Sequence, residues 1–281
     1  MYRLIIADGQ QWHIRGGNPN GRRLADSLAG AMSLISPESF SSPILDDPSA
    51  AISWTMVITG HRAPRLWKRL PMAKNGIVRC HVGPIGNDEL LMAHLLDIGQ
   101  LIASFSERQG GLLLHAALAR QGEQGIILLG GSGRGKTTAS LRIPAPWDSC
   151  CDDYTLVVRD DHGGFQAHPW PTWSRFAKGG PGGAWQVMRS VPLRGMFFLQ
   201  PAPKDTWEPK SPCETVVRIM EAAEQANWPV TMGLQKGQRR SVRLRRLDNA
   251  FALARKVPFF NLHLTLKGKF WLNIAEALHS R

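Results

Sequence analysis

The chain has 281 residues, of which 43% are hydrophobic and 20% charged, and its formal net charge is +12. This composition is ordinary for a globular protein with a sizeable core, and no apolar run approaches the ~18 residues that a membrane helix needs. The N-terminal residues do not read as a signal peptide, so we expect a cytoplasmic protein without membrane association. The charge favours an anionic partner, which leaves nucleic acid, anionic lipid and an acidic peptide open. The cysteines are Cys80, Cys150, Cys151 and Cys213; without a CxxC spacing they predict reduced thiols and neither a disulfide framework nor a zinc site.

Residues 1–90 predict a small, mostly β region. Short strands are expected over 2–7, 51–58 and 76–83, separated by turn-rich segments at 16–23 and 36–50. No residue in this region indicates a function.

The rest of the chain, 91–281, alternates between strand and helix patterns, which is typical of α/β proteins. Helical spacing and glycine or proline stops predict helices, and short apolar runs predict strands. We expect a loop over the Pro-, Gly- and Trp-rich residues 165–185 and a basic strand over 241–247, where apolar residues alternate with arginine. The expected helices cover 88–111, 137–143, 211–228, 248–257 and 270–279, and the other expected strands cover 111–121, 125–131, 149–160, 193–200 and 260–266.

A glycine-rich segment between an apolar strand and a helix matches the pattern G-x-x-x-x-G-K-[ST]. Its glycines let the backbone wrap a phosphate, Lys136 can reach the outer phosphates, and the Thr137 hydroxyl can contact Mg²⁺. A glycine-rich turn with an accidental Lys-Thr is the alternative. The expected ATP-binding residues are Gly130, Gly131, Ser132, Gly133, Arg134, Gly135, Lys136, Thr137 and Thr138.

Two acids and one histidine lie near this motif in the sequence. Asp152 and Asp153 end a predicted strand 15 and 16 residues after Thr137, and His115 lies on the strand before the motif. Nucleotide chemistry needs a carboxylate for the metal and often a second one for the attacking group. The alternatives are a pair of solvated turn acids and a histidine that belongs to the core.

The segment "HAALARQGEQGIILLGGSGRGKTT…WDSCCDDYTLVV" resembles the catalytic domain of bacterial HPr kinase/phosphorylase and its relatives over roughly residues 91–200. "AHPWPTWS" and "PLRGMFFL" look most like the kinase-like proteins encoded with modified-peptide clusters, such as the SynChlorMet cassette proteins; lasso-peptide kinases are a second comparison. The resemblance implies an HPr-kinase-like fold, related to phosphoenolpyruvate carboxykinase, with the region 1–90 added to it. It implies ATP and Mg²⁺ as cofactors, Asp153 as the proton acceptor, Asp152 near the metal and His115 in the active site.

The sequence also departs from that family. The family's glutamate-containing signature after the Asp-Asp strand is missing, so phosphorolysis is in doubt, and residues 1–90 do not match the regulatory domain. The resemblance therefore implies a kinase for a Ser or Thr hydroxyl of a peptide or protein other than HPr. The expected acceptor is a ribosomally made precursor peptide, acidic if it docks on the basic segment, with Trp170, Trp173 and Arg175 shaping its site.

Three other classes stay open. They are a small-molecule kinase, a nucleotide-hydrolysing switch, and a non-catalytic nucleotide-binding scaffold of a peptide-modifying complex. Family members are often oligomers, so a homo-oligomer also stays open. Nucleic-acid binding rests on the net charge without a recognisable module and ranks last.

Overall fold

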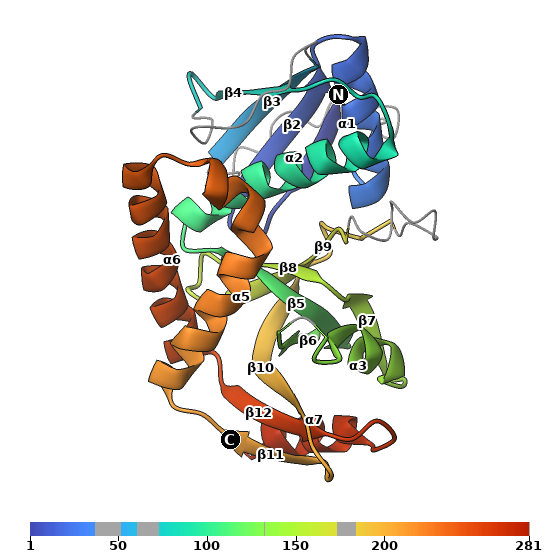
Figure 1. Ribbon diagram of the computed structural model, residues 1–281, viewed down its shortest axis with the longest axis vertical. Coiled ribbons are helices and arrows are strands. Elements are labelled where there is room, and N and C mark those ends of the chain that lie inside the picture. Colours follow the sequence, from blue (N-terminus) through green and yellow to red (C-terminus); the bar gives the residue numbers. More distant parts are fainter. Residues whose placement is uncertain (37–51, 61–72, 132, 173–183, 281) are drawn as a thin grey trace.

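The computed structural model describes residues 1–36, 52–60, 73–131, 133–172 and 184–280. These residues form two β-sheets and six α-helices, which confirms the mixed α/β class (Figure 1). None of the described helices is both long enough and apolar enough to cross a bilayer.

The N-terminal sheet has four strands in the order β1-β2-β3-β4. The pair β1–β2 is antiparallel, whereas β2–β3 and β3–β4 are parallel. Helix α1 (Pro19–Met32) connects β2 to β3 and buries an apolar stripe that includes Leu24 and Leu28. The strands are β1 (Tyr2–Ile5), β2 (Gln10–Gly16), β3 (Ile52–Gly60) and β4 (Ile77–Val82).

The C-terminal sheet has eight strands in the order β11-β12-β10-β6-β5-β8-β9, with β7 also paired to β5. Its centre combines the parallel pairs β12–β10 and β10–β6 with the antiparallel pair β6–β5. Its strands are β5 (Leu112–Gln121), β6 (Gln124–Leu129), β7 (Trp147–Cys151), β8 (Tyr154–Arg159), β9 (Phe165–Trp170), β10 (Val191–Pro201), β11 (Thr206–Pro209) and β12 (Phe259–Leu264).

Both faces of the C-terminal sheet are covered. In β6, Ile127 and Leu129 belong to the core shared with α2 and α5, whereas Ile126 and Leu128 belong to the core shared with α3 and α7. This explains why the central strands read as continuous apolar runs instead of alternating patterns. The helices of this part are α2 (Asp88–Arg108), α3 (Lys136–Arg142), α5 (Pro212–Gly233), α6 (Lys236–Lys256) and α7 (Phe270–His279).

Helix α2 lies between the two sheets (Figure 1). Its residues 98–107 are all buried, as expected for a helix that is covered on every side. The core residues of the N-terminal sheet and of β5 and β8 accordingly form one hydrophobic cluster around it.

Four secondary-structure predictions need correction. The basic segment 241–247 is not a strand but part of α6, and the turn-rich segment 16–23 contains the start of α1. The predicted loop 165–185 begins as strand β9, and the predicted strand 149–160 is interrupted at Asp152 and Asp153, between β7 and β8.

Candidate active site

The glycine-rich loop connects β6 to α3, with β6 ending at Leu129 and α3 starting at Lys136. Gly133 and Gly135 have φ angles of +74° and +92°, a region that side-chain-bearing residues rarely adopt. The backbone N–H of Ala139 donates to the carbonyl oxygen of Gly135, which closes the first turn of α3. The loop therefore turns sharply, and the Lys136 side chain lies against the backbone of the loop.

Strand β5 determines where the histidine and the acids lie. Its first half pairs with β8, with His115 opposite Tyr154, and its second half pairs with β7. Asp152 and Asp153 lie at the break between these two partners, and the Asp153 carbonyl oxygen accepts a hydrogen bond from the Ala116 N–H at 2.9 Å. Because the break lies beside His115, the structure brings Asp153 next to this ring.

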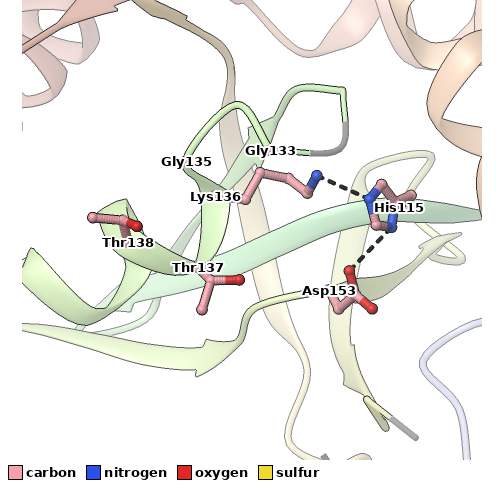
Figure 2. A pocket seen from close by; sticks show the side chains of 7 residues that line it. All are labelled: His115, Gly133, Gly135, Lys136, Thr137, Thr138 and Asp153. Carbon is pink, nitrogen blue, oxygen red and sulfur yellow. Dashed lines mark hydrogen bonds and ion pairs between the residues drawn. The ribbon is translucent and has the colours of Figure 1, made fainter. Parts of the chain in front are cut away.

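Lys136, His115 and Asp153 form a chain of polar contacts (Figure 2). The Lys136 Nζ lies 2.9 Å from His115 Nε2, and the His115 Nδ1 lies 3.1 Å from Asp153 Oδ1. An ammonium group can only donate, so Nε2 accepts, and the proton of a neutral ring is on Nδ1, which donates to Asp153. Lys136 also donates to the carbonyl oxygens of Gly130 and Gly131, at 2.8 and 3.4 Å.

Electrostatics support this assignment of the proton. Burial lowers the pKa of His115, the Lys136 ammonium lowers it further, and the Asp153 carboxylate opposes both. Burial also lowers the pKa of Lys136, against the opposing effect of Asp153 and then of Asp152. A lowered pKa keeps the imidazole neutral near pH 7, so it can accept from Lys136 and donate to Asp153 at the same time.

These side chains line a pocket of about 240 Å³, which we call the loop pocket. Figure 2 shows that the Thr137 hydroxyl and the Asp153 carboxylate lie on the same side of it. The pocket is lined by His115, Gly133, Gly135, Lys136, Thr137, Thr138 and Asp153. The structure therefore brings together His115, Lys136, Asp153 and part of the predicted phosphate loop, while Gly130 and Gly131 accept from Lys136 but do not line the pocket.

Asp152 is not among the described residues that line the loop pocket. Its side chain is 7% exposed and accepts a hydrogen bond from the Thr172 hydroxyl at 3.2 Å. It is nevertheless close enough for its charge to act on Lys136. Within the described residues, no group of three or more His, Cys, Asp and Glu side chains is arranged to hold a metal ion.

The predicted acceptor site is only partly described. Ser132 of the loop, Trp173 and Arg175 lie outside the described residues. Trp170 is described, and the expectation that its ring offers a contact surface is wrong: the side chain is 1% exposed because β9 places it in the core. Arg134 is exposed and lies on the other side of the glycine-rich loop, beside Pro201 and Leu264.

A second hollow, which sequence reasoning missed, adjoins the loop pocket at His115. We call it the α5 cleft; its volume is about 570 Å³, and it is lined by His115, Tyr154, Glu221, Glu224, Gln225 and Trp228. Four of these residues are on α5, about a hundred residues after His115 in the sequence. No local spacing in the sequence could therefore connect α5 with His115. The signal in the sequence is weak: Trp228 falls on the solvent side of α5, as the apolar residues Val217 and Met232 also do.

The chain matches a model of a protein family. The model described as "SynChlorMet cassette protein ScmC" matches residues 78–279, more than two thirds of the chain. The chain belongs to this family. The ScmC match spans the whole eight-stranded sheet and every described residue of the loop pocket and the α5 cleft. It confirms the modified-peptide cluster context predicted from the sequence. No curated protein matches the chain.

Proposed function

We propose that this protein is an ATP-dependent kinase with an HPr-kinase-like catalytic fold, which transfers the γ-phosphoryl group to a serine or threonine hydroxyl of a peptide. The observation that carries the proposal is the chain of contacts Lys136–His115–Asp153 at the glycine-rich loop. The imidazole of His115 joins Lys136 to Asp153. The pocket therefore has a lysine that can neutralise phosphate charge and a carboxylate that can accept a proton.

The chemistry assigns one role to each side chain. The acceptor hydroxyl oxygen attacks the γ-phosphorus, the bond to the β–γ bridging oxygen breaks, ADP leaves, and the hydroxyl proton passes to a carboxylate oxygen of Asp153. The Nδ1–H of His115 holds that carboxylate in place, and the Lys136 ammonium neutralises charge on the transferred group.

Lys136 can bind a phosphate of the nucleotide while its side chain keeps its present position. Two of its hydrogen bonds go to the loop carbonyl oxygens of Gly130 and Gly131, and its third contact goes to His115. A phosphate oxygen in the loop pocket would compete with the His115 nitrogen for one N–H group and leave the other two in place. The lysine is therefore held at the pocket before it meets a phosphate.

The donor set fits Mg²⁺ brought in with ATP. The Thr137 hydroxyl and the Asp153 carboxylate line the loop pocket and are hard oxygen ligands, and Mg²⁺ bound to substrate phosphates needs only one or two protein ligands. When bound, the ion neutralises charge on the β and γ oxygens.

The proposal is tested by transfer of label from [γ-³²P]ATP–Mg²⁺ to synthetic peptides that contain serine or threonine, including precursor peptides of modified-peptide clusters. Asp153→Asn removes the proton acceptor, so we expect the rate to fall by about 10²–10⁴-fold, while binding of a fluorescent ATP analogue persists. The matched control is Asp148→Asn, because Asp148 is on the neighbouring strand and 68% exposed; its rate should equal that of the wild type.

Two outcomes would refute the proposal. An Asp153→Asn rate within threefold of wild type would exclude Asp153 as the proton acceptor. Failure of the wild-type protein to label any peptide, with ATP still bound, would favour a small-molecule acceptor or a non-catalytic scaffold.

A further inference from the structure

The loop pocket lies between two larger hollows. On one side, the α5 cleft shares His115 with it. On the other side, a cleft of about 420 Å³ shares Gly133, Gly135 and Thr138 with it and is otherwise lined mainly by apolar residues such as Pro201 and Leu264. Both hollows have volumes in the range of ligand-binding sites.

The position of Asp153 distinguishes these two neighbours. Asp153 contacts His115, and His115 is the wall shared with the α5 cleft. The apolar cleft meets the loop pocket at the glycine-rich loop instead, away from the carboxylate. An acceptor hydroxyl must approach the carboxylate that takes its proton, so the proposed reaction favours the α5 cleft for the acceptor and leaves the apolar cleft for the nucleoside.

The α5 cleft has a distinct chemistry. Trp228 is 61% exposed, although tryptophan side chains are usually well buried. Its neighbours one turn and two turns earlier on α5 are Glu224 and Glu221, which also line the cleft. The side chains of these two glutamates are 42% and 50% exposed.

Each glutamate retains capacity for a ligand. Glu221 accepts from Arg218 through Oε2, at 2.9 Å, and Glu224 accepts from Arg243 through Oε1, at 2.8 Å. A carboxylate has about four lone-pair sites on its two oxygens, so these surface pairs hold the glutamates in place without using all of their acceptor positions. An indole face beside two carboxylates favours a cation, which gains both ion pairing and a cation–π contact.

We propose that the α5 cleft is the acceptor subsite and that it binds a lysine or arginine side chain of the peptide close to the phosphorylated hydroxyl. This rests on the proposed kinase function and adds a substrate preference to it. The preference is opposite to the one that the net charge of +12 suggests, because the described residues that line the cleft include two glutamates and neither lysine nor arginine.

The test uses a positional library of nonapeptides with a central serine, [γ-³³P]ATP and Mg²⁺. For the wild-type protein we expect kcat/KM to be at least tenfold higher with Lys or Arg than with Glu or Asp at one or more positions near the serine. The double variant Glu221→Gln/Glu224→Gln should reduce this ratio below threefold, and Trp228→Ala should raise KM for the preferred peptide with little change in kcat.

Control variants separate the local effect from a change in net charge. Glu89→Gln/Glu123→Gln also removes two negative charges, from exposed positions on α2 and in the β5–β6 turn, and should keep the wild-type ratio. Leu272→Ala truncates an apolar side chain on α7 that is 60% exposed, and KM should not change.

The outcomes separate the two proposals. A ratio in Glu221→Gln/Glu224→Gln within twofold of the wild-type ratio, or a wild-type preference for acidic peptides, would overturn the subsite while the kinase proposal stands. If the wild-type protein binds ATP but labels no peptide of the library, the peptide-kinase proposal fails, and the subsite fails with it.

Discussion

Replacing Arg246 should expose how strongly α6 is held to α2. Arg246 is 4% exposed and donates through Nε to Glu107 Oε1 at 2.9 Å, and Glu107 is 1% exposed. A second bond joins Arg246 Nη1 to the Thr231 hydroxyl at 3.1 Å. In Arg246→Met the aliphatic part of the side chain is largely kept, but Glu107 is left buried without its cation.

The same helix supplies a control three residues earlier. Arg243 also pairs with a glutamate, Glu224, at 2.8 Å, but the two side chains are 71% and 42% exposed. Removing one partner of a buried pair costs about 3–5 kcal/mol, whereas an exposed pair contributes about 0–1 kcal/mol. We therefore expect Arg246→Met to lose about 3–5 kcal/mol of unfolding free energy, and Arg243→Met less than about 1 kcal/mol.

The assay is urea unfolding followed by circular dichroism at matched protein concentration. A lower midpoint with an unchanged slope would show that stability has changed and that the surface exposed on unfolding has not. Glu107→Gln added to Arg246→Met removes the stranded charge and should recover part of the loss. If Arg246→Met and Arg243→Met differ by less than about 1 kcal/mol, the contrast between a buried and an exposed pair is wrong for this protein.

Two further predictions concern α1 and β9. In Gly21→Ala the new Cβ would collide with the backbone of β3, so we expect the unfolding free energy to fall by at least about 1–3 kcal/mol. Gly30 is on the same helix, but a Cβ added there has no neighbouring atom within 4 Å. Gly30→Ala should therefore leave the unfolding free energy, measured in urea, unchanged or raise it by up to about 1 kcal/mol. Equal effects of the two would contradict this packing. His168 accepts from the Ala7 N–H at 3.1 Å and contacts the Val187 carbonyl oxygen at 2.7 Å through Nδ1, and burial lowers its pKa from the ordinary 6.5, with the Val187 bond opposing. Because the unfolded chain then takes up this proton first, stability should fall as the pH drops from 6.5 toward the lower folded pKa; if His168→Gln leaves that slope of unfolding free energy against pH unchanged, the assignment is wrong.

Much of the C-terminal sheet could be predicted, because its strands and helices carry strong local signals. β6 and β10 are apolar runs that the sheet buries on both faces. The start of α5 carries a capping box, in which the Ser211 hydroxyl accepts from the Glu214 N–H and Glu214 accepts from the Ser211 N–H. Such signals need no knowledge of the distant chain.

Only the second half of α6 was predicted as a helix, over 248–257, because polar residues fill two of the buried positions of α6. Val242, Arg246, Asn249 and Leu253 are buried and recur at helical spacing. Arginine and asparagine are rarely buried unless they are paired, and here Arg246 pairs with Glu107 while Asn249 donates to the carbonyl oxygens of Glu107 and Gly111. Sequence reasoning treats both as surface residues, so over 241–247 a strand-like alternation was visible and the helical spacing was not.

Two other errors have local causes. Asn18 and Pro19 read as turn residues, but the same pair is a helix start: the Asn18 side chain caps α1 by accepting from the Gly21 N–H, and proline suits the first turn. In β9, Pro169 suggested a loop. It is tolerated because β9 pairs along its length with β8 but meets β10 only at Gln166 and Ala167, so the proline does not interrupt a ladder on that side.

In the candidate site, too, the features with local sequence signals could be predicted, and the features that depend on distant segments could not. Its motif and the two aspartates could be found because their spacing along the chain is short, and β5 then pairs with both strands that flank the aspartates. The contact of Lys136 with His115 and the contribution of α5 could not be found, because they depend on how the loop folds back and on packing between segments far apart in sequence.

The basic segment shows why net charge is a weak guide to the partner. Together with the residues just before it, the segment spans 236–247 and has six basic residues. Among them, Arg246 is buried against Glu107, Arg243 pairs with Glu224, and Arg239 donates to the carbonyl oxygens of Met232 and Leu234 at the end of α5. These three arginines fix α6 to its neighbours and help to shape the α5 cleft, so they have structural roles within the protein. The charge that an acceptor would meet is that of the cleft lining, which is why a local substitution of two glutamates tests the partner more sharply than the salt dependence of binding would.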